Sequence, residues 1–219
     1  MLIICGSSSA FAESIYEKPI LFRGIEWGTP YNEVVESYEN KGETVWKPDG
    51  LDADFFNGQA KHYGEVGFAM RSGLPEGETV AGYEVDYYDG VHFNFVYTPD
   101  ETGRLSEDKD HAVLCFASYM FDFGGKIEEY NAALEDLTNK LTLLYGDIDS
   151  EPSAGYGNRA VWKGAEGTLV SLYCNRGSYL NGGYYYRIFI QYSFEGMEDL
   201  LQDAKAALDK DFASITDGL

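Results

Sequence analysis

The chain has 219 residues and a formal net charge of −21, from 37 acidic and 16 basic side chains. Hydrophobic residues at 44% and aromatic residues at 16% suffice for a packed core, so the chain is not mainly disordered. Such a negative field repels phosphate backbones, which argues against nucleic acid as a partner, and no run of about 18 apolar residues indicates a membrane span. The acidic surface is compatible with simple solubility or with a basic protein partner.

Residues 1–12, MLIICGSSSAFA, are interpreted as a signal peptide, possessing the cleavage site but lacking the positive region that opens such segments. Small residues follow an apolar start, and Ala10-Phe11-Ala12 matches the A-x-A pattern ahead of Glu13. A lipoprotein modified at Cys5 and a buried N-terminal strand are the two other interpretations. The favoured prediction is a secreted or extracytoplasmic protein.

The stretch IEWGTPYNEVVESY (25–38) places Trp27 and Gly28 at the entrance to a predicted helix. Thr29 is suited to cap this helix and Pro30 to occupy its first position. The apolar residues of this helix recur at helical spacing and form one stripe, which comprises Tyr31, Val34, Val35 and Tyr38. We interpret Trp27 as a wedge between helix and sheet, and the alternative is an exposed platform for a ligand.

The stretch TVAGYEVDYYDGVHFNFVY (79–97) predicts a β-hairpin around Asp89-Gly90. A loop of three residues with a left-handed Gly90 gathers the apolar side chains on one face. Further strands are predicted over 112–121, 159–164, 167–175 and 184–193.

The predicted hairpin contains the first candidate site. It sets Asp86 opposite His92 and Glu84 opposite Asn94, on the face away from the apolar row. A carboxylate beside an imidazole can perform acid–base chemistry or hold a metal. The alternative is an ordinary solvated pair across two strands.

Two further helices are predicted in the second half. The first begins near Ile127 and ends at Gly146, and its apolar stripe comprises Ile127, Tyr130, Leu134, Leu137, Leu141 and Leu144. The second covers the C-terminal stretch, with an apolar side formed by Met197, Leu200, Leu201, Ala204, Leu208 and Phe212. The order of helices and strands predicts an α+β fold in which the helices pack on antiparallel sheet.

An internal repeat relates the two halves. The stretch 25–38 aligns with FDFGGKIEEYNAAL (121–134), so that Trp27 matches Phe123 and Gly28 matches Gly124. A Val-Trp-Lys core recurs downstream, in 44–50 and in 160–167. We therefore predict two tandem repeats of a helix followed by antiparallel strands, residues 13–120 and 121–219, packed as one unit with a C-terminal helix. Because Phe fills the place of Trp27 in the second copy, the repeat favours the wedge.

Cys115 and Cys174 lie in predicted strands of different halves. A disulfide between them and two buried free thiols are both open interpretations. Neither cysteine has the His and acidic neighbours in sequence that indicate a nucleophile.

The stretch FRGIEWGT (22–29), followed by an amphipathic helix, resembles the opening of secreted proteins of unknown function from Gram-positive bacteria. That resemblance carries no known activity. The plan of two helix-then-strands units is similar to the beta-lactamase inhibitor protein family. That family has a disulfide inside each repeat, whereas each half of the mature chain holds one cysteine, and no inhibitory residue is carried over.

The sequence favours a non-catalytic binding protein that contacts a protein of the bacterial envelope. Its three histidines are scattered, it has no Walker loop and no G-x-S-x-G motif, and no cofactor or metal is predicted. A carbohydrate-binding module is the alternative, because YLNGGYYY (179–186) clusters Tyr184, Tyr185 and Tyr186 beside glycines. A hydrolase with an unidentified pair of carboxylates is the third possibility.

Overall fold

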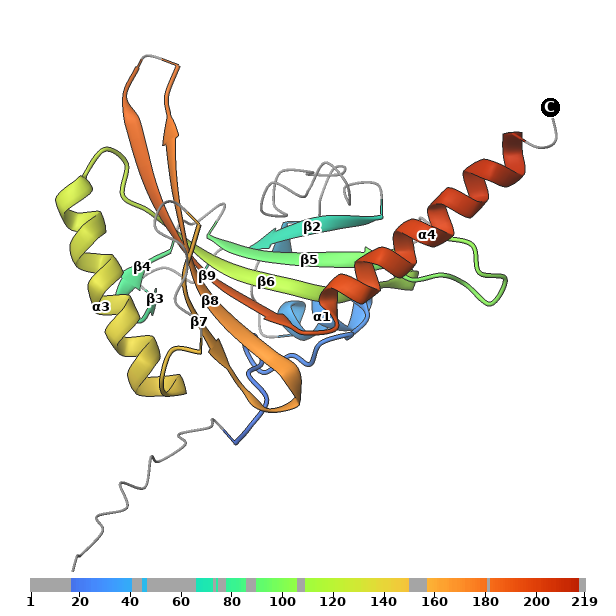
Figure 1. Cartoon of the computed structure of the whole chain (residues 1–219), viewed down its shortest axis with the longest axis horizontal. Coiled ribbons are helices and arrows are strands. Elements are labelled where there is room, and N and C mark those ends of the chain that lie inside the picture. Colours follow the sequence, from blue (N-terminus) through green and yellow to red (C-terminus); the bar gives the residue numbers. More distant parts are fainter. Residues whose placement is uncertain are drawn as a thin grey trace, which may run out of the picture.

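The computed structural model describes residues 17–40, 45–46, 66–72, 74, 78–85, 90–105, 109–149, 157–180 and 182–216. The predicted signal peptide therefore lies outside the described residues. An antiparallel sheet of seven strands, in the order β1-β2-β5-β6-β9-β8-β7, forms the centre of the molecule (Figure 1). The second sheet has two strands, β3 and β4.

The strands of the large sheet are β1 (Val45–Trp46), β2 (Gly67–Ser72), β5 (Val91–Tyr97), β6 (Ala112–Asp122), β7 (Gly157–Lys163), β8 (Thr168–Ser178) and β9 (Tyr184–Phe194). The small sheet pairs β3 (Thr79–Val80) with β4 (Tyr83–Glu84). The α-helices are α1 (Tyr31–Glu39), α3 (Ile127–Tyr145) and α4 (Met197–Thr216). Short 3-10 turns span Lys109–His111 and Ala165–Gly167.

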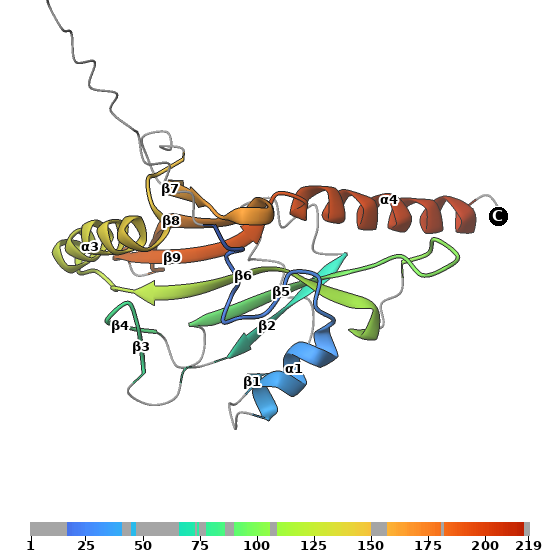
Figure 2. The ribbon, with the colours of Figure 1, turned by 90° about the horizontal axis from the view of Figure 1, so that it is seen from below.

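Helices cover both faces of the large sheet. The apolar sides of α1 and α3 join the main core, which includes Phe93 and Phe95 of β5 and Ile188 of β9. On the opposite face, Leu201 and Ala204 of α4 pack in a smaller cluster with residues of β5 and β6. Figure 2 shows α1 and α4 on opposite sides of β5 and β6. The predicted α+β class, with helices packed on antiparallel sheet, is confirmed.

The predicted apolar stripes account for the buried sides of the helices. All four stripe residues of α1 are buried, and so are Tyr130, Leu137 and Leu141 of the α3 stripe. The ends of that stripe are not: Ile127 is 48% exposed and Leu144 is 56% exposed. As predicted, α3 ends at Tyr145 and Gly146 follows with a positive φ of 89°.

The predicted cap of α1 is wrong by one residue. Pro30 is the N-cap, and no side chain caps the helix. The Thr29 hydroxyl instead donates to the backbone oxygen of Glu26, at 2.7 Å. The hydroxyl is thus used to close the turn that contains Trp27, and it is not available to the first turn of α1.

The predicted hairpin over 79–97 is also wrong. Strand β5 pairs with β2 and β6, and β4 pairs with β3 through a tight turn at Ala81 and Gly82. Both turn residues have positive φ, 54° and 87°, as two-residue hairpin loops often require.

The error has a physical reason. Strand β2 was not predicted, because its sequence does not alternate between apolar and polar residues. Five of its six residues are buried. Every residue of β5 is buried as well, so the alternation of a strand with one solvated face does not apply. Gly67 allows the close pairing, because a Cβ there would meet the backbone oxygen of Phe95 at 2.3 Å.

The two described cysteines are free thiols on opposite faces of the sheet. Both are fully buried, with Cys174 in the main core and Cys115 in the cluster beneath α4. The Cys115 thiol donates to the backbone oxygen of Asn94 at 3.3 Å, and burial raises its pKa to about 12. These positions make Cys115 a packing residue and not a reactive nucleophile. In the described part of the chain, no helix is both long and apolar enough for a membrane span.

Candidate functional site

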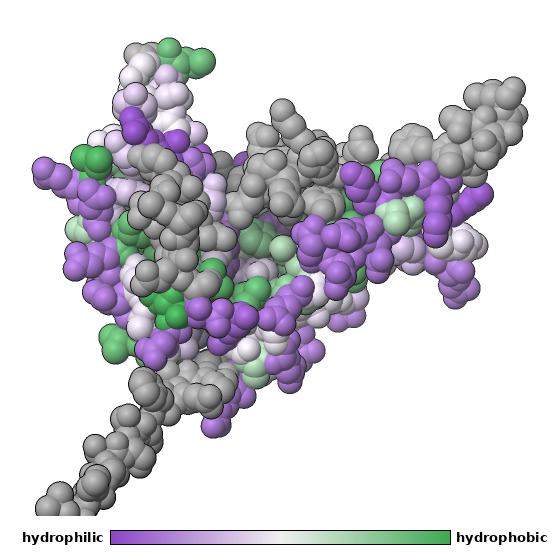
Figure 3. Space-filling view, viewed as in Figure 1, coloured by the Kyte–Doolittle hydropathy of each residue, from purple (hydrophilic) through white to green (hydrophobic). Residues whose placement is uncertain are grey.

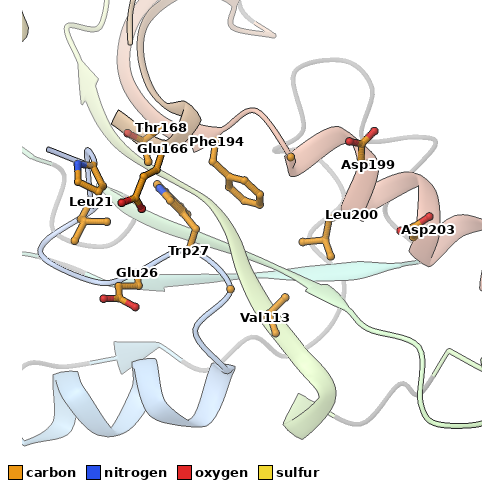
Figure 4. Close-up of a pocket in the computed structure, with 13 residues that line it drawn as sticks. Leu21, Glu26, Trp27, Val113, Glu166, Thr168, Phe194, Asp199, Leu200 and Asp203 are labelled. Atoms are coloured by element: carbon orange, nitrogen blue, oxygen red, sulfur yellow. The ribbon is translucent and has the colours of Figure 1, made fainter. Parts of the chain in front are cut away.

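A cleft of about 630 Å³ lies where the segment before α1 meets β6, the adjoining ends of β8 and β9, and the start of α4 (Figure 4). Its apolar lining includes Leu21, Trp27, Val113, Phe194 and Leu200, and its acidic lining is Glu26, Glu166, Asp199 and Asp203. The lining comes from both ends of the sequence, so the cleft is a product of long-range packing.

Trp27 is half-buried and lies between the N-terminal segment and the end of β9. Its indole Nε1 donates to the backbone oxygen of Ile20 at 3.2 Å, which fixes the ring against the N-terminal segment. The indole also stacks on Phe194, with ring centroids 5.9 Å apart and 26° between the planes. Trp27 therefore packs as a wedge and at the same time lines the cleft.

The wall of the cleft is held by hydrogen bonds between the N-terminal segment and the turn from β7 to β8. Thr168 is the centre of this network: its hydroxyl oxygen accepts from the Ile20 amide and donates to the Ala165 carbonyl, both at 2.8 Å. Ala165 N–H in turn donates to the Lys18 carbonyl at 3.2 Å. Gly164 permits the close approach, since a Cβ there would meet Ile20 Cγ1 at 2.6 Å. The wall is thus fixed before any ligand arrives.

Glu166 occupies a strained backbone position on this wall. Its φ of 58° and ψ of 29° lie in the left-handed region, which costs a non-glycine residue about 1–2 kcal/mol. Gly167 follows with a φ of 69°, so the pair forms the tight end of the β7–β8 hairpin. Glu166 thus adopts a backbone conformation that glycine adopts with less strain. Its carboxylate lines the cleft.

The electrostatic character of the cleft is uniform. Its four acidic residues come from three places: Glu26 before α1, Glu166 between β7 and β8, and Asp199 and Asp203 on α4. Within the described part of the chain, no lysine, arginine or histidine lines it. Carboxylates that face a shared hollow repel one another, and a cation placed between them relieves that repulsion. The geometry therefore suits a positively charged group against an aromatic floor.

The structure does not assemble the site predicted from the 79–97 hairpin. Glu84 is exposed in β4 and pairs with Thr79, while His92 is fully buried in β5. Asp86 lies outside the described residues. The predicted pairing of Glu84 with Asn94 is wrong, because Asn94 pairs with Ala69 and Phe116 in the large sheet. In strand register His92 pairs with Arg71 and Ser118.

His92 instead belongs to a polar row that crosses the large sheet. Strand register aligns five side chains from β2, β5, β6, β9 and β8, which are Arg71, His92, Ser118, Gln191 and Ser171. The Ser171 hydroxyl donates to Gln191 Oε1 at 3.4 Å. The row is mostly buried on the face that α4 partly covers. It could not be predicted without β2 and the register of β9.

The three candidate tyrosines of β9 do not share one surface. Tyr186 is buried against Tyr130, with ring centroids 5.2 Å apart. Tyr184 is 49% exposed, and the Arg176 guanidinium lies 3.8 Å from its ring centroid. Tyr185 points the other way and stacks with Arg187 at 4.5 Å. Strand alternation separates these rings, so they do not form a single exposed row on which a sugar chain would lie flat.

No three His, Cys, Asp or Glu residues of the described segments lie close enough together to hold a metal ion. The sequence identified Trp27 as a residue of interest because of its position between strand and helix. It did not identify Phe194, Glu166 or Asp199, which carry no local motif. The one available signal was the excess of acidic residues near the start of the C-terminal helix.

Comparison of the chain with protein-family models, with curated protein sequences and with solved structures gives no significant match.

Proposed function

We propose that the chain is an exported, non-catalytic binding protein whose Trp27 cleft receives a basic segment of a protein partner. The observation that carries this proposal is that four acidic residues line the same cleft as the stacked pair of Trp27 and Phe194. Lysine and arginine side chains match both features, because their heads pair with carboxylates and their charge is attracted to an indole face.

Magnitudes favour a segment over a single side chain. An exposed ion pair contributes about 0.5–1 kcal/mol and a cation–π contact a similar amount, so even a cation that paired with all four carboxylates and the indole would gain only about 3–5 kcal/mol. That range corresponds to a dissociation constant of about 1 mM, too weak for recognition by itself. A segment with several adjacent basic residues can pair with more of the four carboxylates, which raises the affinity. Because these charges are exposed, added salt is expected to weaken the binding. The cleft volume of about 630 Å³ is ample for such side chains.

The cleft also fits the two-repeat organisation that we propose for the chain. Each half has a helix and three neighbouring strands of the large sheet: α1 with β2, β5 and β6, then α3 with β7, β8 and β9. The first half has β1, β3 and β4 in addition. The halves join through their last strands, β6 and β9. Trp27 and Val113 line the cleft from the first half, and Phe194 and Asp199 from the second. Ligand sites often lie at the interface between two structural units, and the junction of two repeats is an interface of this kind.

Equivalent junctions support the repeat. Gly28 and Gly124 have positive φ, 83° and 53°, and each lies three residues before the first residue of a helix. The amide of Gly28 donates to Leu114 of β6, and the carbonyl of Gly124 accepts from Tyr186 of β9, both at 2.9 Å. Each aromatic-glycine junction is thus bonded to the last strand of its own half. The likeness to the beta-lactamase inhibitor protein plan stays a prediction on the same grounds.

A titration with a short arginine-rich peptide tests the proposal. Glu166→Gln with Asp199→Asn removes two charges from the cleft without changing side-chain size. We expect this variant to bind the peptide about tenfold more weakly, which corresponds to about 1.4 kcal/mol. The matched control is Glu128→Gln with Glu135→Gln, which removes two exposed carboxylates of α3. Equal weakening by both variants shows a general charge effect and contradicts a specific site.

The tyrosines of the β8–β9 hairpin keep carbohydrate binding as a second candidate function. Tyr179 and Tyr184 are 46% and 49% exposed, which leaves ring surface for a sugar. A glycan array probed with the full chain tests this candidate. A hit that Tyr184→Ala abolishes, and that the cleft variant retains, favours the carbohydrate over the basic segment.

A further inference from the structure

The far end of the β8–β9 hairpin is a projecting arm with an apolar tip. We define the arm as Arg176–Leu180 and 182–187 of this hairpin. It rises beyond α3 and the rest of the sheet (Figure 1), and its tip is hydrophobic (Figure 3). Leu180 is 111% exposed relative to the reference for its residue type, the most exposed large apolar side chain among the described residues. An apolar side chain held that far into solvent is typical of an interaction surface.

Hydrogen bonds and a ring contact hold the arm in one conformation in the structure. The Tyr179 amide donates to the Gly183 carbonyl at 2.7 Å, and Gly182 N–H donates to Tyr179 O at 3.0 Å, which closes the turn. The Tyr185 ring covers Gly177, where a Cβ would lie 1.9 Å from its Cζ. A surface fixed in advance loses little conformational entropy on binding. Tyrosine and arginine are also the residues that most often dominate binding energy at interfaces.

The charge of the arm is opposite to that of the cleft. Although the chain carries 37 acidic residues, none occurs between residues 175 and 194. The two charged residues of the arm are Arg176 and Arg187. Arg187 pairs with Asp122 at 2.7 Å at the base, and Arg176 lies nearer the tip against Tyr184. The arm thus offers apolar, aromatic and cationic groups to a partner.

The geometry points to a second copy of this chain as a partner of the cleft, with the arm of one copy seated in the Trp27 cleft of the next. In this contact Tyr179 and Leu180 lie on the aromatic floor and Arg176 faces the carboxylates. The inference rests on the proposed function and names its partner. Its physical basis is complementarity, since the cleft has an apolar floor with an acidic rim and the arm has an apolar tip beside a guanidinium.

The positions of arm and cleft make the contact intermolecular. Thr168 and Phe194 pair at the cleft end of the hairpin, and Ser178 and Tyr184 pair at the arm end. Eleven-residue strands place those ends roughly 33 Å apart, so an arm cannot reach the cleft of its own chain. One copy thus donates an arm and accepts another, which is a head-to-tail interface that extends into longer assemblies.

Analytical ultracentrifugation of the full chain tests this inference with two surface variants. Leu180→Asp with Arg176→Glu disables the arm, and Glu166→Lys with Asp199→Lys disables the cleft. Wild type is expected to form dimers and longer species as its concentration rises toward about 1 mM, and each variant is expected to stay monomeric. Mixed in equal amounts, the two variants retain one good arm and one good cleft, so they are expected to form a 1:1 dimer and nothing longer.

Two results overturn the inference: a wild-type chain that stays monomeric to about 1 mM, or a mixture that stays monomeric while wild type associates. The second result indicates a symmetric interface. Circular dichroism of each variant confirms that it is folded before the mixture is judged. If wild type is monomeric but binds the arginine-rich peptide at the cleft, the proposed function stands and self-association fails. If the mixed variants dimerise but wild type does not bind the peptide, self-association stands and the general proposal of a site for basic segments fails.

Discussion

The indole of Trp27 stacks on the ring of Phe194, joining the segment that precedes the first helix to the end of the last strand. This contact packs the N-terminal segment against the last strand, and the two rings form the aromatic floor of the acidic cleft. A substitution at either residue should therefore affect both the stability of the fold and the binding of cations.

Trp27→Ala is expected to lower the free energy of unfolding by about 2 kcal/mol. Complete truncation of a buried aromatic side chain costs about 3–5 kcal/mol, and Trp27 is only half-buried. Trp27→Phe is the control, because it keeps a stacking ring while it loses the hydrogen bond to Ile20, about 1 kcal/mol, and part of the ring area. Urea unfolding followed by circular dichroism measures both. Equal losses for the two variants would show that the ring itself contributes no packing energy.

Glu166→Gly is expected to separate stability from function. Glycine relieves the left-handed strain of about 1–2 kcal/mol at this position and adds unfolded-state entropy worth about 0.5–1 kcal/mol. The net result is a gain in stability of up to about 1.5 kcal/mol, together with weaker binding of a basic peptide. Thermal unfolding and a peptide titration of the same variant check the two effects. A variant that is markedly less stable than wild type contradicts the account of strain.

The small hairpin is expected to respond to alkaline pH through Tyr83. Its hydroxyl donates to Asp136 of α3 at 2.8 Å, and burial together with that hydrogen bond raises the pKa of Tyr83 to about 12. Because this folded-state pKa exceeds the unfolded value of 10.0, the contribution of Tyr83 is complete below pH 10 and is lost as pH rises toward 12. The stability advantage of wild type over Tyr83→Phe should therefore shrink across that interval.

At acidic pH the stability of the fold is expected to depend on Asp136, which accepts the hydrogen bond from Tyr83. Hydrogen bonds from Lys140 and then Tyr83 lower the pKa of Asp136 below its ordinary 3.8, so its contribution is present above that value and disappears as pH falls through the folded pKa. Urea midpoints of wild type and Tyr83→Phe between pH 2 and pH 12 test both limbs. A difference that is constant over the whole range contradicts this role for the contact.

The second half of the fold could be predicted from sequence better than the first. Strands β8 and β9 are long and bounded by recognisable turns, and the stripe of α3 repeats over several turns. Strand β2 has no alternation, because it is buried on both faces, and without it β5 had no correct partner. The hairpin prediction then placed His92 on a solvated face, although it is fully buried.

The site was predictable only at Trp27. An aromatic residue before a glycine, at the entrance to a helix, is a local pattern that the sequence displays directly. Phe194, Glu166 and Asp199 join Trp27 through the pairing of β8 with β9 and the direction in which α4 leaves the sheet. Those relationships depend on long-range packing, which no local spacing encodes.

The most direct test of the central claim is the NMR spectrum of the full chain during titration with a short arginine-rich peptide. The indole N–H of Trp27 is a reporter inside the cleft, and the indole N–H of the fully buried Trp162 is an internal control. If the cleft binds a basic segment, the Trp27 signal and the amides of Glu166 and Leu200 shift in a saturable manner, while Trp162 does not respond. Saturable shifts confined to residues outside the cleft, with Trp27 unchanged, would contradict the claim that this cleft binds a basic segment.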